Sequence, residues 1–256
     1  MVVYPIFTNK LGKLYNADCL KVLSILKNDS IDLIFADPPF NLGKKYSSLI
    51  NDKKTNDEYL SWTYEWLSLC IKKLKNGGSL FIYNIPKWNI YIANFLINKK
   101  IRFNNWIAID FKVSMPIRNR LYPAHYSLLY FSKGKPNTFN RPKIPIQLCR
   151  HCKKPIKDYG GYKKIINANG GLNLSDVWYD ITPVRHINKK NHNANELPEI
   201  LLERIFQIST KTNDLIMDPF GGSGTSYVVA QKMQRKWIGI EIGNCEPIIN
   251  RINKVI

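Results

Sequence analysis

Two short stretches of this chain combine residue types that can do chemistry, although they lie about 180 residues apart. The first, Asp37-Pro38-Pro39-Phe40, offers an acceptor-only carboxylate, backbone carbonyls and one aromatic face. Such a set can hold a flat base by stacking while it accepts hydrogen bonds from an exocyclic amine. The alternative is a proline-stiffened turn with Phe40 packed in the core. The second stretch, Asp218 to Thr225, favours the first interpretation because it adds a ligand-binding pattern.

That second stretch is rich in glycine and reads Asp218-Pro219-Phe220-Gly221-Gly222-Ser223-Gly224-Thr225. It follows a predicted strand and opens a predicted helix, so backbone N–H groups and the helix dipole favour an anionic group there. A nucleotide phosphate and an amino-acid carboxylate both suit this place. The pattern matches neither of the glycine motifs that bind ATP or dinucleotides. Glu241, 20 residues past Gly221, ends the next strand, where a carboxylate can hold ribose hydroxyls. A tight turn with a solvated glutamate is the alternative.

The elements around these stretches predict an α/β fold. Ile31 to Ala36 is an apolar run typical of a buried strand, and the prolines after it force an extended loop at the strand's carboxyl end. Open α/β sheets bind their ligands at such ends. Strands are also predicted over 11–17, 79–83, 101–109, 126–131, 214–217 and 236–240. Helices are predicted over 20–26, 55–74, 88–98, 197–208, 227–233 and at the C-terminus. The second of these begins with a capping box at Thr55, and Asn76-Gly77-Gly78 is expected to stop it after Leu74. The alternation indicates a Rossmann-like, mostly parallel sheet flanked by helices.

Charge and composition narrow the partners. The 256-residue chain carries a formal net charge of +19, and residues 112–165 contain 13 Lys or Arg and one acid. A basic segment of this density predicts a nucleic-acid partner. No apolar run is long enough to span a bilayer, and the first residues do not resemble a signal peptide. Five scattered cysteines predict a reducing, cytoplasmic setting.

The two motifs together resemble those of the S-adenosylmethionine-dependent DNA amino-methyltransferases. Their order, with the Asp37 motif first and the Asp218 motif last, is similar to the circularly permuted beta group of that family. Leu201 to Ile205 and Trp237 to Glu241 also fit the family. The resemblance covers about 11–132 and 194–256. It implies a catalytic part over 1–132, an inserted target-recognition region over 133–193, and a cofactor-binding part over 194–256.

The resemblance also implies roles for particular residues. Asp37, Pro38, Pro39 and Phe40 would form the catalytic loop. The contacts to S-adenosylmethionine would come from both ends of the chain, namely Asp18, Cys19, Asp37, Asn195, Asp218, Phe220, Gly221, Gly222, Ser223, Gly224, Thr225 and Glu241. Leu197 stands where related chains often carry Lys, so Asn195 and Glu196 are weaker candidates. On the residues alone, Asp18 is a helix N-cap and Cys19 a small core residue.

The implied reaction is methyl transfer to a base that has left the double-stranded DNA helix, with Phe40 stacked on it. An acidic first residue in the motif favours adenine N6, and cytosine N4 is the alternative target. A non-catalytic basic DNA-binding module is the rival from another class. A cognate restriction endonuclease and a homodimer are further partners that the family implies.

The middle segment contains the residues expected to contact DNA and a cysteine pair that could bind zinc. Lys153, Lys154 and Lys157, with Arg118 and Arg120 nearer the sheet, are expected to contact DNA, although solvated surface is the alternative for each. Cys149 and Cys152 form a CxxC that His186 and His192 could complete as a zinc site. The long gap to His186 favours free thiols instead, so no metal is expected.

Overall fold

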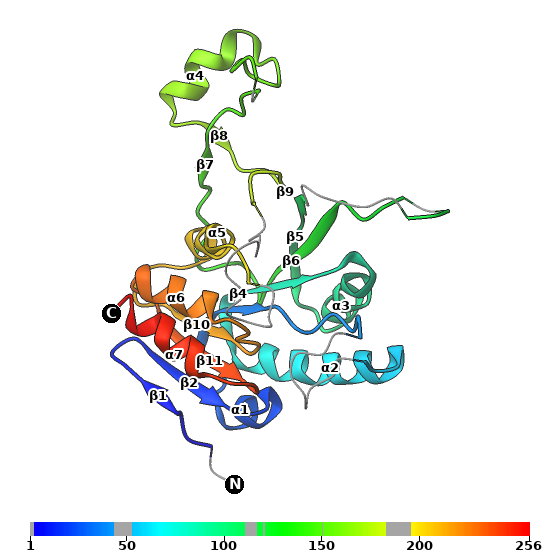
Figure 1. Cartoon of the computed structure of the whole chain (residues 1–256), viewed down its shortest axis with the longest axis vertical. Helices are drawn as coiled ribbons and strands as arrows, with labels where there is room; N and C mark the ends of the chain where they lie inside the picture. The colour runs from blue at the N-terminus through cyan, green and yellow to red at the C-terminus, as the bar shows by residue number, and fades with distance from the viewer. Residues whose placement is uncertain (1–2, 44–52, 111–116, 120, 150, 183–195) are drawn as a thin grey trace.

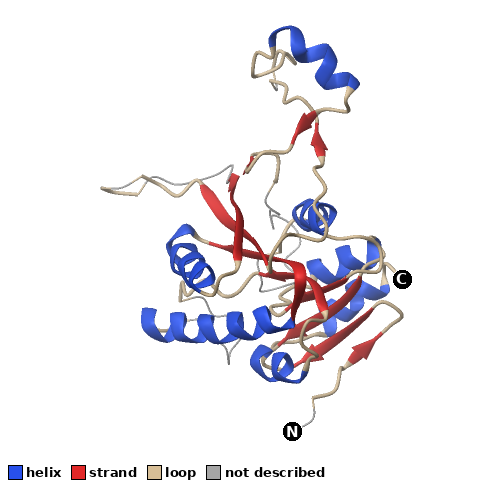
Figure 2. Cartoon of the chain, turned by 180° about the vertical axis from the view of Figure 1, so that it is seen from behind, coloured by secondary structure: helices blue, strands red, loops and turns tan. Residues whose placement is uncertain are grey.

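A computed structural model describes residues 3–43, 53–110, 117–119, 121–149, 151–182 and 196–256. Its centre is one sheet with the strand order β1-β2-β11-β10-β3-β4-β6-β5-β9, and helices cover both faces (Figures 1 and 2). The strands are β1 (Phe7–Thr8), β2 (Gly12–Asn16), β3 (Ile31–Ala36), β4 (Leu74–Asn84), β5 (Arg102–Asp110), β6 (His125–Ser132), β9 (Val177–Trp178), β10 (Leu215–Asp218) and β11 (Lys236–Glu241). The main helices are α1 (Cys19–Ile25), α2 (Asn56–Lys73), α3 (Pro86–Asn98), α5 (Glu199–Ser209), α6 (Thr225–Lys232) and α7 (Glu246–Asn253).

The helices bury two separate apolar layers, one on each face of the sheet. Helices α1, α2 and α3 pack on one face, where Trp66, Trp88 and Leu96 are buried. Helices α5, α6 and α7 pack on the other, where Phe206, Tyr227 and Ile248 are buried. The amphipathic patterns in the sequence therefore produce a three-layer α/β fold, as predicted.

The order in which the chain adds strands to the sheet reverses between β3 and β10. Strand β4 lies next to β3 on one side, and β11 lies next to β10 on the other. Strands β3 and β10 are parallel neighbours, with Ile216 opposite Leu33 and Met217 opposite Ile34. The helix that follows β3 packs on one face, and the helix that follows β10 packs on the other. Loops that diverge in this way leave a crevice at the carboxyl ends of the strands, where α/β folds bind ligands.

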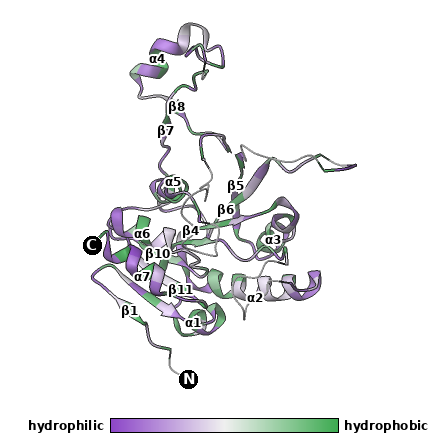
Figure 3. Ribbon diagram, viewed as in Figure 1, coloured by the Kyte–Doolittle hydropathy of each residue, from purple (hydrophilic) through white to green (hydrophobic). Residues whose placement is uncertain are grey.

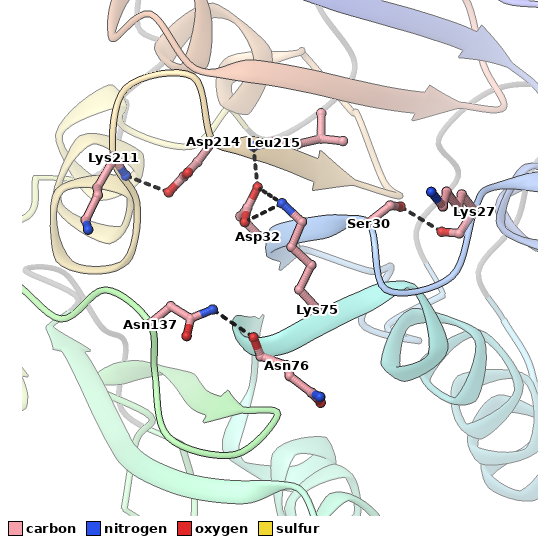
Figure 4. A network of polar contacts seen from close by, with 9 residues as sticks. All are labelled: Lys27, Ser30, Asp32, Lys75, Asn76, Asn137, Lys211, Asp214 and Leu215. Atoms are coloured by element: carbon pink, nitrogen blue, oxygen red, sulfur yellow. Dashed lines mark hydrogen bonds and ion pairs between the residues drawn. The ribbon is translucent and has the colours of Figure 1, made fainter.

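Polar contacts at the opposite end of the sheet fix the register of these strands (Figure 4). Asp32 on β3 accepts a hydrogen bond of 2.9 Å from the Leu215 backbone N–H on β10. Its carboxylate also pairs with Lys75 on β4 at 2.7 Å. One half-buried carboxylate thus joins the starts of three adjacent strands. The register that it helps to set determines which residues meet at the far ends.

The glycine stop predicted for α2 was wrong, and one edge strand was missed. Helix α2 has the predicted capping box at Thr55, and its first turn is hydrophilic (Figure 3), but it ends at Lys73 rather than at the glycines. Gly77, at φ +75°, lies within β4, where a built Cβ would fall 2.2 Å from the Asn137 side chain. The main sheet is mostly parallel, as predicted: β2, β11, β10, β3 and β4 pair in parallel, as do β5 and β9, whereas β6 runs antiparallel to β4 and β5. The short edge strand β1 was not predicted.

Part of the middle segment projects from the body (Figure 1). Its strands β7 (Lys143–Ile144) and β8 (Leu172–Asn173) pair as a stalk that carries the short helices η1 (Gly160–Tyr162) and α4 (Lys163–Ala168). We call residues 141–175 the head. No described residue of the head is buried. After the head, β9 returns to the main sheet beside β5, so part of the predicted insertion lies within the sheet. Among the described residues, no helix is long and apolar enough to cross a membrane.

Candidate functional site

The two sequence motifs follow the neighbouring strands β3 and β10. Asp37 directly follows β3 and Asp218 ends β10, and the parallel register brings both strand ends to the same edge of the sheet. Asp37 is half-buried and Pro38 is buried. Two motifs that are far apart in the sequence therefore lie at neighbouring strand ends, and their joint role as one site stays a prediction.

Aromatic rings surround the first loop. The Phe40 ring lies 5.9 Å from the Tyr126 ring and 6.1 Å from the Tyr83 ring, measured between centroids. Burial raises the pKa of both tyrosines, and the nearby charge of Asp37 raises each pKa further. Since Asp37 acts on two tyrosines, its carboxylate lies beside this aromatic cluster of Phe40, Tyr83 and Tyr126. The motif predicted Phe40 alone, because Tyr83 and Tyr126 come from β4 and β6.

The glycine loop adopts backbone conformations that side chains rarely allow. Gly222 has φ +52° and Gly224 has φ +77°. A Cβ built on Gly222 meets no atom within 4 Å, and Gly222 is the one exposed residue from Gly221 to Thr225. A ligand can therefore approach the backbone closely at Gly222. Gly221, in contrast, leaves no room for a side chain, because a Cβ built on it would fall 2.6 Å from the Tyr227 hydroxyl.

The Asp218 side chain stabilises the glycine loop through two hydrogen bonds. One carboxylate oxygen accepts a hydrogen bond from the Phe220 N–H at 2.9 Å, and the other accepts one from the Ser226 hydroxyl at 2.5 Å. Asp218 is 3% exposed, and this burial raises the pKa of its carboxyl to about 7. The hydrogen bonds from Ser226 and Phe220 oppose that rise only in part. With both oxygens engaged, Asp218 shapes the loop.

Glu241 lies directly beside the glycine loop. Its two carboxylate oxygens accept hydrogen bonds of 2.7 Å from the N–H groups of Gly222 and Gly243. Burial raises the pKa of Glu241, while these N–H groups oppose the rise. The strand end of Glu241 pairs with Asn16 at the end of β2. A carboxylate held at this point can meet hydroxyl groups of a ligand that lies along the loop.

Asp18 and Cys19 follow β2 and therefore lie at the same edge. The Asp18 side chain caps α1 by accepting a hydrogen bond from the Leu20 N–H at 2.8 Å. Cys19 is buried, and its burial followed by the charge of Asp18 raises the pKa of its thiol to about 12. Both residues thus have the structural roles that the sequence offered as alternatives. Their contact with a cofactor stays a prediction.

Phe220 packs against α2. Its ring centroid lies 5.1 Å from that of Trp66 and 5.6 Å from that of Trp62, and both contacts are edge-on. Edge-to-face packing of this kind holds a ring in one orientation. Phe220 therefore joins the glycine loop on one strand to the helix that follows the Asp37 loop.

Arg251 on α7 is a residue that the motifs did not predict. Its guanidinium donates to the Ser223 carbonyl at 2.9 Å and to the Thr225 hydroxyl at 3.3 Å. It also pairs with Glu196 at 2.7 Å. Glu196, a weaker candidate for ligand contact in the sequence, thus reaches the glycine loop through Arg251. The basic residue in the last turn of a C-terminal helix carried no signal of this role.

The remaining candidates lie elsewhere. Lys153, Lys154 and Lys157 are exposed on the head, and Arg118 is exposed on the segment between β5 and β6. Cys149 and Cys152 lie in a turn of the head, where the Cys149 N–H donates to the Lys154 carbonyl at 2.7 Å. The described part of the chain contains no group of three metal-ligating side chains. Predictions for four more residues fall outside the described residues: Arg120, His186, His192 and Asn195.

Comparison with known proteins places this geometry in a family context. The family model described as "DNA methylase" matches residues 31–249. The type II methyltransferase M.BamHI of Bacillus amyloliquefaciens is 55% identical over 98% of this chain, which spans 59% of that relative's length. The DNA adenine methyltransferase YhdJ of Escherichia coli is 31% identical over 93% of this chain and 81% of its own length. The crystal structure of the M1.HpyAVI–SAM complex superposes with a TM-score of 0.62, at 24% identity, over 96% of this chain and 98% of that one.

Proposed function

Because the chain belongs to the DNA methylase family, we propose that its site transfers a methyl group from S-adenosylmethionine to an exocyclic amine of a base in double-stranded DNA. The single observation that carries this proposal is the register of β3 and β10, which brings a half-buried carboxylate and a glycine loop to the same edge of the sheet. We assign adenine N6 as the target. Support for adenine comes from the acidic residue that begins the first motif and from the name of the relative YhdJ.

The residues of the second motif fit S-adenosylmethionine. The open space at Gly222 allows the cofactor to lie against the backbone, and the amino end of α6 favours its carboxylate. Glu241, which accepts from the Gly222 N–H, would bind the ribose hydroxyls, and Phe220 would contact the methionine moiety. Asp18, Cys19 and Asn195 are the proposed contacts from other segments. When bound, the cofactor supplies a methyl group on a positively charged sulfur.

The residues of the first motif fit an amine as the methyl acceptor. An exocyclic amine is a poor nucleophile because its lone pair is delocalised into the ring. Asp37 and the Pro38 carbonyl accept the two amine hydrogens, which localises the lone pair on nitrogen for in-line attack. As the N–C bond forms, the S–C bond would break with its electron pair returning to sulfur, which leaves a neutral thioether, and the nitrogen would then release one proton to solvent. Positioning and electrostatics carry the reaction, with no covalent enzyme intermediate.

The aromatic cluster fits a base that has left the DNA stack. Phe40 and Tyr126, both half-buried, lie with the buried Tyr83 in the cluster beside Asp37, and stacking on Phe40 would stabilise a flipped base. The exposed lysines of the head, with Arg118 and Arg120, supply the positive charge that duplex DNA requires. A partner restriction endonuclease and a homodimer complete the proposal, and both come from the family resemblance.

Digestion of the DNA product to nucleosides tests the proposal. The chain is incubated with labelled S-adenosylmethionine and unmethylated DNA, and we expect the label in N6-methyladenine. Label in N4-methylcytosine would contradict the adenine assignment and leave amine methylation intact. DNA binding without any transfer, unaffected by S-adenosylmethionine, would instead support a non-catalytic DNA-binding module.

A further inference from the structure

The backbone that follows Asp37 is held by donors from two helices. The Tyr59 hydroxyl, on α2, donates to the Pro39 carbonyl at 2.8 Å. The Trp88 indole N–H, on α3, donates to the Phe40 carbonyl at 2.7 Å. These are consecutive carbonyls, so two successive peptide planes of the loop are fixed. The first motif in the sequence gives no hint of either donor.

The next residue along the loop is held as well. The Asn41 side chain accepts from the Lys54 N–H at 2.8 Å and donates to the Lys54 carbonyl at 3.0 Å. Asn41 has φ +54°, a conformation that asparagine tolerates better than most residues. This double contact ties the end of the loop to the residues just before α2. Three consecutive residues of the loop are thus hydrogen-bonded, two through their backbone carbonyls and Asn41 through its side chain.

The two donors are themselves held firmly. Tyr59 and Trp88 are each 1% exposed, and their ring centroids lie 4.5 Å apart. The Tyr59 hydroxyl also accepts a hydrogen bond of 3.2 Å from the buried Asn84 side chain at the end of β4. Asn84 in turn accepts from the Ile85 N–H at 2.8 Å. The donors are therefore packed against each other, and Tyr59 is hydrogen-bonded to the end of β4.

The two carbonyls that Tyr59 and Trp88 hold are not the carbonyl to which we assign a role in the reaction. The Pro39 and Phe40 carbonyls are bonded to Tyr59 and Trp88, whereas no described residue bonds to the Pro38 carbonyl. Fixing the later peptide planes sets the direction of the Pro38 carbonyl and of the Phe40 ring. In-line transfer depends steeply on such placement, since a displacement of about 1 Å costs about 100-fold in rate.

We propose that Tyr59 and Trp88 are positioning residues that fix the Asp37 loop in its reactive geometry. The inference rests on the proposed function, because the loop's reactivity is what these residues serve. Neither side chain touches the base or the cofactor in this account. Their effect is therefore confined to the rate of transfer once both ligands are bound.

The test compares Tyr59→Phe and Trp88→Phe with a matched control, Tyr64→Phe. Each test variant removes one hydrogen-bond donor and keeps an aromatic ring. Tyr64 lies on the same helix, but its ring stacks on Phe95, centroid to centroid at 4.4 Å. Single-turnover methylation and S-adenosylmethionine binding are measured well below the melting temperature of each variant. We expect the rate to fall at least tenfold in Tyr59→Phe and Trp88→Phe, with the Kd for the cofactor within about twofold. Tyr64→Phe should match the unmodified chain.

Two results would overturn the inference. One is transfer at the unmodified rate in both test variants. The other is a rise in the cofactor Kd that accounts for the slower rate, which would indicate general loosening. If Tyr59→Phe does not fold, Trp88→Phe decides alone. Asp37→Asn serves as a separate benchmark, because full activity in that variant would contradict the proposed function itself.

Discussion

The carboxylates of Asp37 and Asp218 lie at neighbouring strand ends, but their surroundings differ. Asp218 is buried, and both of its oxygens accept hydrogen bonds from the loop that it begins. Asp37 is half-buried beside the cluster of Phe40, Tyr83 and Tyr126. A carboxylate in the first setting shapes the backbone, and one in the second can meet a ligand. The same residue type thus serves structure in one loop and has a proposed chemical role in the other.

Asp37→Asn should abolish methyl transfer while cofactor binding persists. The amide presents a donor where the carboxylate accepts, so the target amine loses an acceptor. We expect the transfer rate to fall by about 100-fold or more, in the range typical of a lost electrostatic contact in the transition state. Radiolabel transfer to DNA measures the rate, and calorimetry measures cofactor affinity. Asp57→Asn, exposed in the first turn of α2, is the control. Loss of transfer and cofactor binding together would contradict the role of Asp37.

Asp218→Asn should change how stability depends on pH. Burial raises the pKa of Asp218 from 3.8 to about 7, so the folded chain holds this proton more tightly than the unfolded chain. Its contribution to the free energy of unfolding is therefore full below about pH 4 and is lost as pH rises toward 7. Asparagine mimics the protonated form at every pH. Denaturant unfolding at pH 5 and pH 8 should show the unmodified chain losing stability relative to Asp218→Asn. An equal difference at both pH values would refute the raised pKa.

At the scale of elements, α7 supports the glycine loop from outside. Ile248 packs so closely that a Cβ on Gly224 would fall 2.6 Å from its side chain. One turn later, Arg251 donates to the Ser223 carbonyl and pairs with Glu196. An apolar contact and a charged hydrogen bond from one helix therefore fix two consecutive loop residues. The loop conformation depends on the last helix of the fold.

Arg251→Gln should weaken cofactor binding more than it slows transfer. The shorter amide cannot reach both Ser223 and Glu196, so the loop loses one anchor. We expect the Kd for S-adenosylmethionine to rise about tenfold, in keeping with the value of roughly 1.5 kcal/mol for a charged hydrogen bond. At saturating cofactor the transfer rate should recover. Lys254→Gln, exposed just beyond α7, should leave both quantities unchanged. An unaltered Kd in Arg251→Gln would show that the loop keeps its conformation without this anchor.

At the scale of the whole molecule, the chain separates a cored body from a head that buries no described side chain. Arg204 on α5 links the body to the segment that leaves the head, through a bidentate pair with Asp180 at 2.9 and 2.5 Å. A small unit without a core contributes little stability of its own. The surface of the head is therefore available for contact with a partner, and its lysines favour an anionic one.

Replacing Lys153, Lys154 and Lys157 together with Gln should reduce the salt dependence of DNA binding. Each lysine that neutralises a phosphate contributes about −0.9 to the slope of log K against log salt concentration, so the slope should become shallower by up to about 2.7. Fluorescence anisotropy across a salt series measures the slope. A matched triple variant of Lys10, Lys13 and Lys21, exposed around the opposite edge of the sheet, should keep the original slope. Equal slopes in all three proteins would exclude the head as the DNA-binding surface.

Local sequence determined much of this protein. Apolar runs and caps predicted nearly all the strands and helices of the body, because burial periodicity and hydrogen-bonding caps act over a few residues. The prolines after Ala36 and the glycines after Phe220 identified both loops for the same reason, since each restricts or frees its own backbone.

The tertiary structure decided which residues complete those loops. The backbone carbonyls of the two loops accept hydrogen bonds from side chains on other helices, namely Tyr59, Trp88 and Arg251. The aromatic cluster is completed from two different strands, by Tyr83 and Tyr126. The reversal of β6 and the end of α2 before Gly77 also depend on neighbouring strands. Contacts of this kind depend on sheet order and register, and these emerge only when the apolar layers pack together.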